Sequence, residues 1–424
     1  MNNSFKYALV LLVILLASTL VISCGGEADT TTTLVDTTTE ATMSTADTTT
    51  AIASTTTTAV KVTTASKMTT KLTTVADATT VFTFPTVTPS GTQRPKDEVT
   101  PIIIIPGIMG SQLSDSVGNI LWPADISSAG MQKLSQLHLE NGASNITSVS
   151  LAPVAQALVN PAIHIGSNDT YRELASALAA EFGANNVYFF GYDWRQDLPL
   201  SAIELYKFIE QVKYTSNDDK VNIVAHSMGG LVLTSYLSLC NDQGRATSID
   251  TAVTAGTPFY GAEKATAVVG GYGDFLKDYV NVDQIISSPA GSVMLDTISD
   301  LIIGLAKSYP SIYTMIPSAS YEKLDTEMRT AAGVKGRVTA DWLTSKYTSA
   351  FASVEHYNLV GTRKNTLSVI TPAGSESYVD GDGTVSYASA VGAFEGATKS
   401  FNGIDHGKLV ESPDALNYIV GCFK

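Results

Sequence analysis

The residues best suited to covalent chemistry form one hexapeptide, Ala-His-Ser-Met-Gly-Gly, at positions 225–230 of this 424-residue chain. It follows a short apolar run and opens a longer apolar stretch of the kind expected for a buried helix. A reactive serine on a tight strand-to-helix turn needs small residues two places before and two places after it. Ala225 and Gly229 meet that requirement, so we expect Ser227 to be a nucleophile. The alternative is an ordinary serine in a strand–helix turn.

A serine hydroxyl is a weak nucleophile until a base removes its proton, and histidine is the commonest base. The chain has five histidines: His138, His164, His226, His356 and His406. In enzymes with this kind of elbow the chain order is nucleophile, acid, histidine. Only His406 follows the acid candidates, so we expect it to be the general base. The other four are interpreted as structural, with a supporting role for His226 as the main exception.

The acid of such a triad is expected in a loop after a late strand. Residues 379–385, Val-Asp-Gly-Asp-Gly-Thr-Val, offer Asp380 and Asp382 in a turn-rich setting. We choose Asp382, whose carboxylate would hold the imidazole in the right tautomer. The alternatives are a solvated turn or a calcium loop, and the latter lacks a closing Glu at the required spacing.

The negative oxygen of an acyl-transfer intermediate needs two backbone N–H donors. One is expected to be Met228, the residue after the nucleophile. The other is assigned to Ile108, in the glycine-containing segment 106–111 after the first apolar run. The alternative for this segment is a plain turn at the end of a strand.

The elements around these residues alternate between short apolar runs and helical patterns. The predicted strands cover 101–105, 186–192, 221–225, 249–255 and 357–360. The predicted helices cover 169–182, 203–212, 228–239 and 292–307, with Ser201 as the N-cap of the second. This alternation predicts an α/β fold, an α/β-hydrolase with a mostly parallel central sheet flanked by helices. The interruption at about 261–347 predicts a cap or lid insertion, and 120–165 is a candidate for a second, smaller cap element.

The amino terminus has the features of an export signal. Lys6 precedes an apolar run that ends at the tetrad Val-Ile-Ser-Cys, residues 21–24, so residues 1–23 are predicted to be a signal peptide. Cys24 is the predicted lipidation site of a bacterial type of lipoprotein, which would tether the chain to a membrane surface. The alternatives are ordinary cleavage followed by secretion, or an uncleaved anchor.

Between this signal and the folded part lies a threonine-rich stretch. Of the 61 residues from 30 to 90, 27 are Thr, and no apolar periodicity is present. Such a segment cannot bury enough surface to offset its ordering entropy. We therefore predict a disordered stalk over 24–98 and a catalytic domain over 99–424.

Charge and cysteine content limit the partners. The net charge of −14 argues against nucleic acid and against docking on anionic lipid, both of which need clustered basic residues. No cofactor and no metal is expected, because no Cys/His cluster has ligand spacing. If Cys24 is lipidated, Cys240 and Cys422 form either one disulfide or two thiols. The oligomeric state is left open.

Five motifs in order resemble a known family. They are 103–113 (Ile-Ile-Ile-Pro-Gly-Ile-Met-Gly-Ser-Gln-Leu), 192–195 (Tyr-Asp-Trp-Arg), 226–230, 256–261 (Gly-Thr-Pro-Phe-Tyr-Gly) and 381–385. Together they are similar to lecithin:cholesterol acyltransferases and lysosomal phospholipase A2-type enzymes over about 101–406. The resemblance implies the triad Ser227, Asp382 and His406 with oxyanion donors Ile108 and Met228. No cysteine pair flanks Trp122, so the disulfide-closed lid of the animal enzymes is not expected.

Three functions follow as expectations. The first is a serine-dependent lipase or esterase that acts on lipid acyl esters through an acyl-enzyme. The second is an O-acyltransferase that passes the acyl group to an alcohol. The third is a non-catalytic, surface-anchored binding protein, which fits the stalk but not an intact set of Ser, His and Asp. A peptidase on the same scaffold is a weaker alternative.

Overall fold

A parallel sheet forms the centre of the domain. The computed structural model describes residues 82–124, 128–140, 146–272 and 291–424, of which 128 and 291–295 are described by their backbone alone. Within these ranges the largest sheet runs in the order β11–β8–β7–β6–β1–β5, and its neighbouring strands are parallel. Its strands are β1 (Ile102–Ile105), β5 (Val187–Phe189), β6 (Val221–His226), β7 (Ile249–Ala255), β8 (Glu355–Thr362) and β11 (Thr398–Asn402). The predicted α/β architecture is confirmed.

The isoleucines of β1 show why these short apolar runs become central strands. All four are fully buried, and successive side chains on a strand point to opposite faces. Ile102 and Ile104 belong to one apolar cluster with residues of α4 (Arg172–Phe182) and α15 (Pro413–Gly421). Ile103 and Ile105 belong to a second cluster with residues of α5 (Leu198–Ser216) and α6 (Met228–Asp242). The sheet is therefore covered by helices on both faces, as parallel sheets require.

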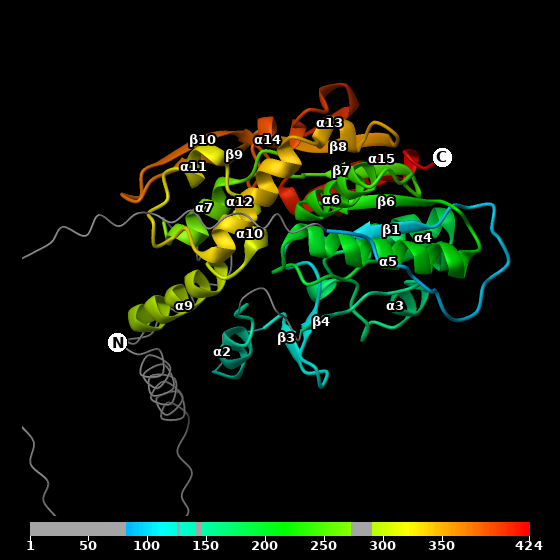
Figure 1. Cartoon of the computed structure of the whole chain (residues 1–424), viewed down its shortest axis with the longest axis horizontal. Coiled ribbons are helices and arrows are strands. Elements are labelled where there is room, and N and C mark those ends of the chain that lie inside the picture. The colour runs from blue at the N-terminus through cyan, green and yellow to red at the C-terminus, as the bar shows by residue number, and fades with distance from the viewer. Residues whose placement is uncertain (1–81, 125–127, 141–145, 273–290) are drawn as a thin grey trace, which may run out of the picture. The chain divides into compact units, whose positions relative to one another are not determined.

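Two insertions interrupt the alternation of strands and helices. The first, between β1 and α4, holds β2 (Leu113–Ser114), β3 (Ile120–Trp122), α2 (Ser128–Ser135), β4 (Thr147–Ser148) and α3 (Ala155–Val159). The second, between β7 and β8, holds α7 (Glu263–Gly270), α9 (Gly291–Ala306), α10 (Pro310–Thr314), α11 (Ser318–Tyr321), α12 (Ala331–Thr344) and α13 (Tyr347–Ala350). Helices α7, α9, α10, α11 and α12 gather beyond one end of the central strands (Figure 1). The residues expected to form a cap, about 261–347, run from α7 to the start of α13, and 273–290 lie outside the described residues.

A hairpin and a late strand were not predicted. β9 (Lys364–Ile370) and β10 (Glu376–Gly381) pair antiparallel, and α14 (Tyr387–Val391) follows them. Most of β10 and three of the five residues of β11 are exposed, so neither strand has the continuous apolar run by which the buried strands were found. The four short 3-10 helices are η1 (Ser167–Asp169), η2 (Ala184–Asn186), η4 (Glu395–Ala397) and η5 (His406–Val410), within the described ranges.

The start of α5 also differs from expectation. The helix begins at Leu198 with Asp197 at its N-cap, so the N-cap assigned to Ser201 is wrong. Pro199 explains the earlier start, because proline is favoured in the first turn of a helix, where its missing N–H is not needed. Gly183 directly follows the predicted helix 169–182, and it is the C-cap of α4 at a positive φ of 83°.

The folded part begins earlier than residue 99. The Phe84 ring stacks on Tyr206 of α5 at 4.3 Å between centroids. The Arg94 guanidinium donates to the Tyr188 hydroxyl at 2.9 Å and to the Asn186 side chain at 3.2 Å. The predicted domain start at residue 99 is therefore too late, because the Phe84 and Arg94 side chains already contact the folded part. The predicted signal peptide, Cys24 and the stalk up to residue 81 lie outside the described residues.

The structure also describes the two remaining cysteines and the length and apolar character of the helices. Cys240 and Cys422 are both free thiols, so the disulfide alternative does not hold in this structure. Burial raises the pKa of Cys240 to about 11 and that of Cys422 to about 12. In the part of the chain that the structure describes, no helix combines the length and the apolar character needed to cross a bilayer.

Candidate active site

Ser227 occupies a strained turn between β6 and α6. Its backbone has φ 54° and ψ −128°, outside the regions that residues with a side chain normally adopt. The Ser227 N–H donates to the carbonyl of Ala255 at the end of β7, and its own carbonyl accepts from the Gly230 N–H. Strain of this kind persists only where the surroundings fix it, and it is the geometry of a nucleophile elbow.

Close approach of the backbone explains the small residues around the elbow. A side chain at Gly229 would place its Cβ 2.6 Å from the carbonyl oxygens of Ile105 and Pro106. A Cβ at Gly107 would lie 2.8 Å from Ser227 Cβ. The segment that leaves β1 therefore passes directly against the elbow, which a larger residue at either position would prevent.

A buried carboxylate, Asp382, pairs with the partly exposed His406. Asp382 Oδ2 lies 2.7 Å from His406 Nδ1, and Asp382 Oδ1 accepts from the N–H groups of Thr384 and Val385. The His406 N–H in turn donates to the Asp382 carbonyl at 2.9 Å. Burial opposes ionisation of Asp382, but the facing His406 and these hydrogen bonds outweigh it and lower the pKa of the carboxyl. An ionised carboxylate can only accept, so His406 Nδ1 carries a proton and Nε2 is left to act as a base.

His406 lies beside the elbow, next to the residue that follows β7. It begins η5, and its ring faces Gly256, where a Cβ would lie 2.9 Å from two ring atoms. Its ring centroid is 4.8 Å from that of His226, the residue before Ser227. Within the described residues no hydrogen bond joins Ser227 to His406. Contacts of this kind are often long before substrate binds.

His226 connects two parts of the site that are distant in sequence. Its Nε2 lies 3.2 Å from the His406 carbonyl oxygen, and its Nδ1 lies 2.9 Å from the Tyr171 hydroxyl. A carbonyl can only accept, so Nε2 carries the proton, Nδ1 accepts from Tyr171, and the Tyr171 oxygen accepts from the Gly107 N–H at 2.8 Å. Burial, followed by the charge of His406, lowers the pKa of His226 to about 3. The imidazole is therefore neutral at ordinary pH, with one tautomer fixed by its partners.

Sequence reasoning allowed His226 a supporting role but missed Tyr171. Tyr171 is the N-cap residue of α4, and its burial gives no sequence signal that its hydroxyl reaches Gly107.

The two N–H groups expected to hold an oxyanion come from the segment after β1 and from the first turn of α6. Among the described residues, neither the Ile108 nor the Met228 N–H has an acceptor, whereas the Gly107 N–H is taken by Tyr171. Met228 is the first residue of α6, where backbone N–H groups lack partners inside the helix. The Ile108 segment is held by its neighbour Met109, whose carbonyl accepts from the Trp122 indole and the Ser167 hydroxyl.

The remaining candidates lie apart from this arrangement. Asp380 is exposed on β10 and accepts from the Arg363 N–H. His164 is half exposed and pairs with Asp169, and His138 is exposed. The His356 ring stacks on Phe351, and its Nε2 lies 2.8 Å from the Thr254 hydroxyl. Of the two aspartates considered as the acid, the structure brings only Asp382 to His406.

Comparison with known families finds a match over part of the chain. The model of the family described as lecithin:cholesterol acyltransferase matches residues 164–329. The chain is similar to the lecithin:cholesterol acyltransferase family. The matched span contains Tyr171, His226, Ser227 and Met228 and ends before Asp382, so the resemblance inferred from five motifs is confirmed by a match over part of the chain.

Single relatives add little to the family match. An uncharacterized protein of Saccharomyces cerevisiae, YJR098C, is 41% identical over 78 residues, which are 18% of this chain and only 12% of the yeast protein. The mature lipase BlEst2 of Bacillus licheniformis is 13% identical with a TM-score of 0.37, covering 79% of this chain and 96% of the lipase. The naproxen esterase of Bacillus subtilis is 11% identical with a TM-score of 0.32, covering 78% of this chain and 85% of the esterase. Similarities of this size say nothing about the reaction.

An apolar cleft begins at Ile108, one of the two residues expected to supply an oxyanion donor. Its volume is about 100 Å³, and residues of both insertions line it. The lining residues are Ile108, Met109, Trp122, Ala124, Leu134, Leu137, Trp194, Val268, Ile302, Leu305, Ala306, Tyr309 and Ile312. A wider and more polar depression of about 720 Å³ lies along β4 and α5 and is lined by neither Ser227, Asp382 nor His406.

Proposed function

We propose that this protein is a serine-dependent lipase or esterase that hydrolyses lipid acyl esters, with Ser227, His406 and Asp382 as its triad. The observation that carries the proposal is the Asp382–His406 pair, whose 2.7 Å contact leaves His406 Nε2 available beside the strained Ser227 turn. The match of residues 164–329 to the lecithin:cholesterol acyltransferase family supports an ester-directed activity.

The reaction proceeds in two halves. Ser227 Oγ attacks the ester carbonyl while His406 Nε2 takes the hydroxyl proton, and the Ile108 and Met228 N–H groups hold the negative oxygen. Collapse of this intermediate breaks the ester bond, and His406 returns the proton to the leaving alcohol. Water then attacks the acyl-enzyme, again giving its proton to His406, and release of the acid restores the Ser227 hydroxyl. Asp382 stays ionised throughout and stabilises the imidazolium.

The apolar cleft supplies the site for the acyl chain. It starts at Ile108, next to the expected position of the oxyanion, and continues between the first insertion and α9–α10. Apolar side chains make up nearly all of its lining, which suits a hydrocarbon chain better than a polar group. The scissile carbonyl and the chain attached to it would then be bound by neighbouring parts of one segment.

An O-acyltransferase is the second candidate, because the matched family is named for that reaction. The acyl-enzyme would be the same, and an alcohol would replace water in the second half. The third candidate, a non-catalytic surface protein, shares none of this chemistry.

The experiment is a product assay with p-nitrophenyl esters and phospholipids, run with and without an added alcohol, on the wild type and on Ser227→Ala. We expect free fatty acid from the wild type and none above background from the variant. A new ester formed only with alcohol present would favour the acyltransferase. Equal release by the two proteins would refute the serine mechanism.

Export and anchoring form a separate proposal. The signal-like residues 1–23 and the Cys24 tetrad support a lipoprotein at the cell surface, with the threonine-rich stalk as a spacer. Radiolabelled palmitate should enter the wild type and not Cys24→Ala. Absence of label from the wild type, or label in the variant, would remove the anchor and leave plain secretion.

A further inference from the structure

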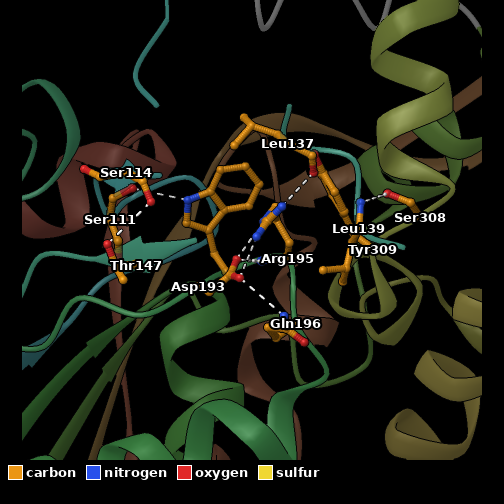
Figure 2. A network of polar contacts seen from close by, with 11 residues as sticks. Ser111, Ser114, Leu137, Leu139, Thr147, Asp193, Arg195, Gln196, Ser308 and Tyr309 are labelled. Atoms are coloured by element: carbon orange, nitrogen blue, oxygen red, sulfur yellow. Dashed lines mark hydrogen bonds and ion pairs between the residues drawn. The ribbon is translucent and has the colours of Figure 1, made fainter. Parts of the chain in front are cut away.

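The Leu137 carbonyl lies between the core and the cap. It accepts a hydrogen bond from Arg195 Nη1 at 2.8 Å and another from the Tyr309 hydroxyl at 2.9 Å (Figure 2). Arg195 follows β5, whereas Tyr309 lies between α9 and α10 in the second insertion. Leu137 itself belongs to the first insertion, just after α2. One carbonyl oxygen therefore joins three separate parts of the chain.

Arg195 is a fixed donor on the core side. Its side chain is 1% exposed and binds Asp193 through two contacts, Nε to Oδ1 at 2.8 Å and Nη2 to Oδ2 at 2.7 Å. A two-point pair between a guanidinium and a carboxylate fixes direction as well as distance. The Arg195 guanidinium is therefore held in a fixed orientation toward the Leu137 carbonyl. This gives the Tyr-Asp-Trp-Arg motif a role beyond that of a scaffold.

The cap side has two ties to the same short segment. Besides the Tyr309 hydroxyl, the Ser308 hydroxyl accepts from the Leu139 N–H at 3.1 Å (Figure 2). The Tyr309 ring packs edge-on against Trp194, with centroids 5.8 Å apart. Burial raises the pKa of Tyr309 far above its ordinary value, so the phenol keeps its proton and remains a donor.

The same residues form the walls of the apolar cleft. Leu137 and Tyr309 both line it, and so do Leu134 and Trp122 from the first insertion and Leu305 from the second. The first insertion contributes one wall of the cleft and the second insertion the other. The hydrogen bonds of Tyr309 and Ser308 to the backbone of Leu137 and Leu139 therefore set the distance between the two walls. An apolar cleft whose walls are fixed discriminates between chains by size, because misfitting chains leave gaps or clash.

We propose that the Arg195–Leu137–Tyr309 tie fixes the width of this cleft and makes Tyr309 a determinant of acyl-chain size. The inference rests on the proposed esterase function. Tyr309 positions a wall and takes no part in proton transfer. Loss of its hydroxyl should relax the preference for chain length while the reaction at Ser227 stays the same.

The test is Tyr309→Phe, which removes one hydroxyl and keeps the ring. Arg195 still satisfies the Leu137 carbonyl, so no buried acceptor is left without a donor. We expect the ratio of kcat/KM between long-chain and short-chain p-nitrophenyl esters to change by about fivefold, the factor that one net hydrogen bond corresponds to. Ser308→Ala combined with Tyr309→Phe should change the ratio further.

Tyr313→Phe is the matched control. Tyr313 is also a buried tyrosine of the second insertion, but its hydroxyl donates to the Met328 carbonyl and its side chain does not line the cleft. This variant should keep the wild-type ratio. The inference would be overturned if Tyr309→Phe kept the wild-type ratio of kcat/KM between long-chain and short-chain esters. It would also be overturned if Tyr313→Phe changed this ratio by the same amount as Tyr309→Phe.

A binding measurement separates this inference from the proposed function. Trp122 and Trp194 line the cleft, so their fluorescence should report binding of free saturated fatty acids of increasing length. On a Ser227→Ala background, Tyr309→Phe should shift the chain-length dependence of Kd in the same direction as kcat/KM. A wild type without esterase activity would refute only the proposed function. If Ser227→Ala binds fatty acids with the same dependence of Kd on chain length with and without Tyr309→Phe, the role of Tyr309 in setting the cleft width is refuted.

Discussion

His226 Nε2 lies 3.2 Å from the backbone oxygen of His406, although 180 residues separate the two histidines. This contact joins the end of β6 to the start of η5. Through Tyr171 the same imidazole also reaches Gly107, in the segment that carries the Ile108 N–H. The loop of the proposed base and the loop of the proposed oxyanion donor are therefore held by one neutral side chain.

Replacement of His226 should lower kcat more than it changes KM. His226→Leu removes the donor to the His406 carbonyl and the acceptor of the Tyr171 hydroxyl, so both loops lose a positioning contact. A displacement of about 1 Å in a catalytic group can cost about 100-fold, and we expect a decrease of about 10- to 100-fold in kcat on soluble esters.

His356→Leu is the control for this prediction. His356 is also largely buried, but it contacts Thr254 and Phe351, away from the site. Its replacement should lower the melting temperature with little change in kcat. Equal kcat values for the two variants would contradict a positioning role for His226.

The choice of acid makes a sharp prediction. Asp382→Asn should reduce kcat/KM by about 10³- to 10⁴-fold, because an amide favours the wrong tautomer of His406. Asp380→Asn changes an exposed carboxylate two residues away and should stay within about threefold, as surface substitutions usually do. Kinetics on one soluble ester suffice, and the opposite ranking would move the acid to Asp380.

The two buried histidines predict how stability changes with pH. Burial lowers the pKa of both His226 and His356 to about 3, below the ordinary value of 6.5. Between these values the unfolded chain binds more protons than the folded one. The free energy of unfolding should therefore fall as pH falls from about 6.5, by about 1.4 kcal/mol per pH unit for each histidine.

Urea unfolding at pH 7, 6 and 5 measures this slope. Asp382, whose pKa is lowered, weakens the fold only at still lower pH, below its ordinary 3.8, so it does not contribute in this range. His356→Gln should remove about half of the slope. A free energy of unfolding that is constant from pH 7 to 5 would show that neither histidine is buried in its neutral form.

The buried strands and the elbow could be predicted from the sequence because a local pattern of residues identifies each of them. Strands such as β1 and β6 are buried on both faces, so their continuous apolar runs identify them, and the elbow is recognised because its turn demands small residues. The approach of Asp382 to His406 was expected only from chain order. Tyr171 and the Leu137 carbonyl were missed because their roles depend on contacts across 64 and 58 residues of sequence, which no local pattern encodes. The exposed strand β10 was missed because it has no apolar run.

The corrected domain boundary predicts different outcomes for two truncations. A protein that starts at residue 82 keeps the Phe84–Tyr206 stack and the Arg94 hydrogen bonds, whereas one that starts at 99 loses both. Loss of one partly buried aromatic ring should cost about 2 kcal/mol. We expect the longer protein to unfold like the full chain and the shorter one at lower urea. Identical midpoints would mean that residues 82–98 contribute nothing to the fold.

The most direct test of the central claim is covalent labelling of Ser227 by a fluorophosphonate, followed by mass spectrometry of the modified peptide. The phosphorus centre takes the place of the ester carbonyl and reacts only with an activated serine. We predict one label on the wild type, located at Ser227, and none at that position in Ser227→Ala, with labelling slowed strongly in His406→Ala. A folded wild type that takes up no label, or a label at another serine, would contradict the account.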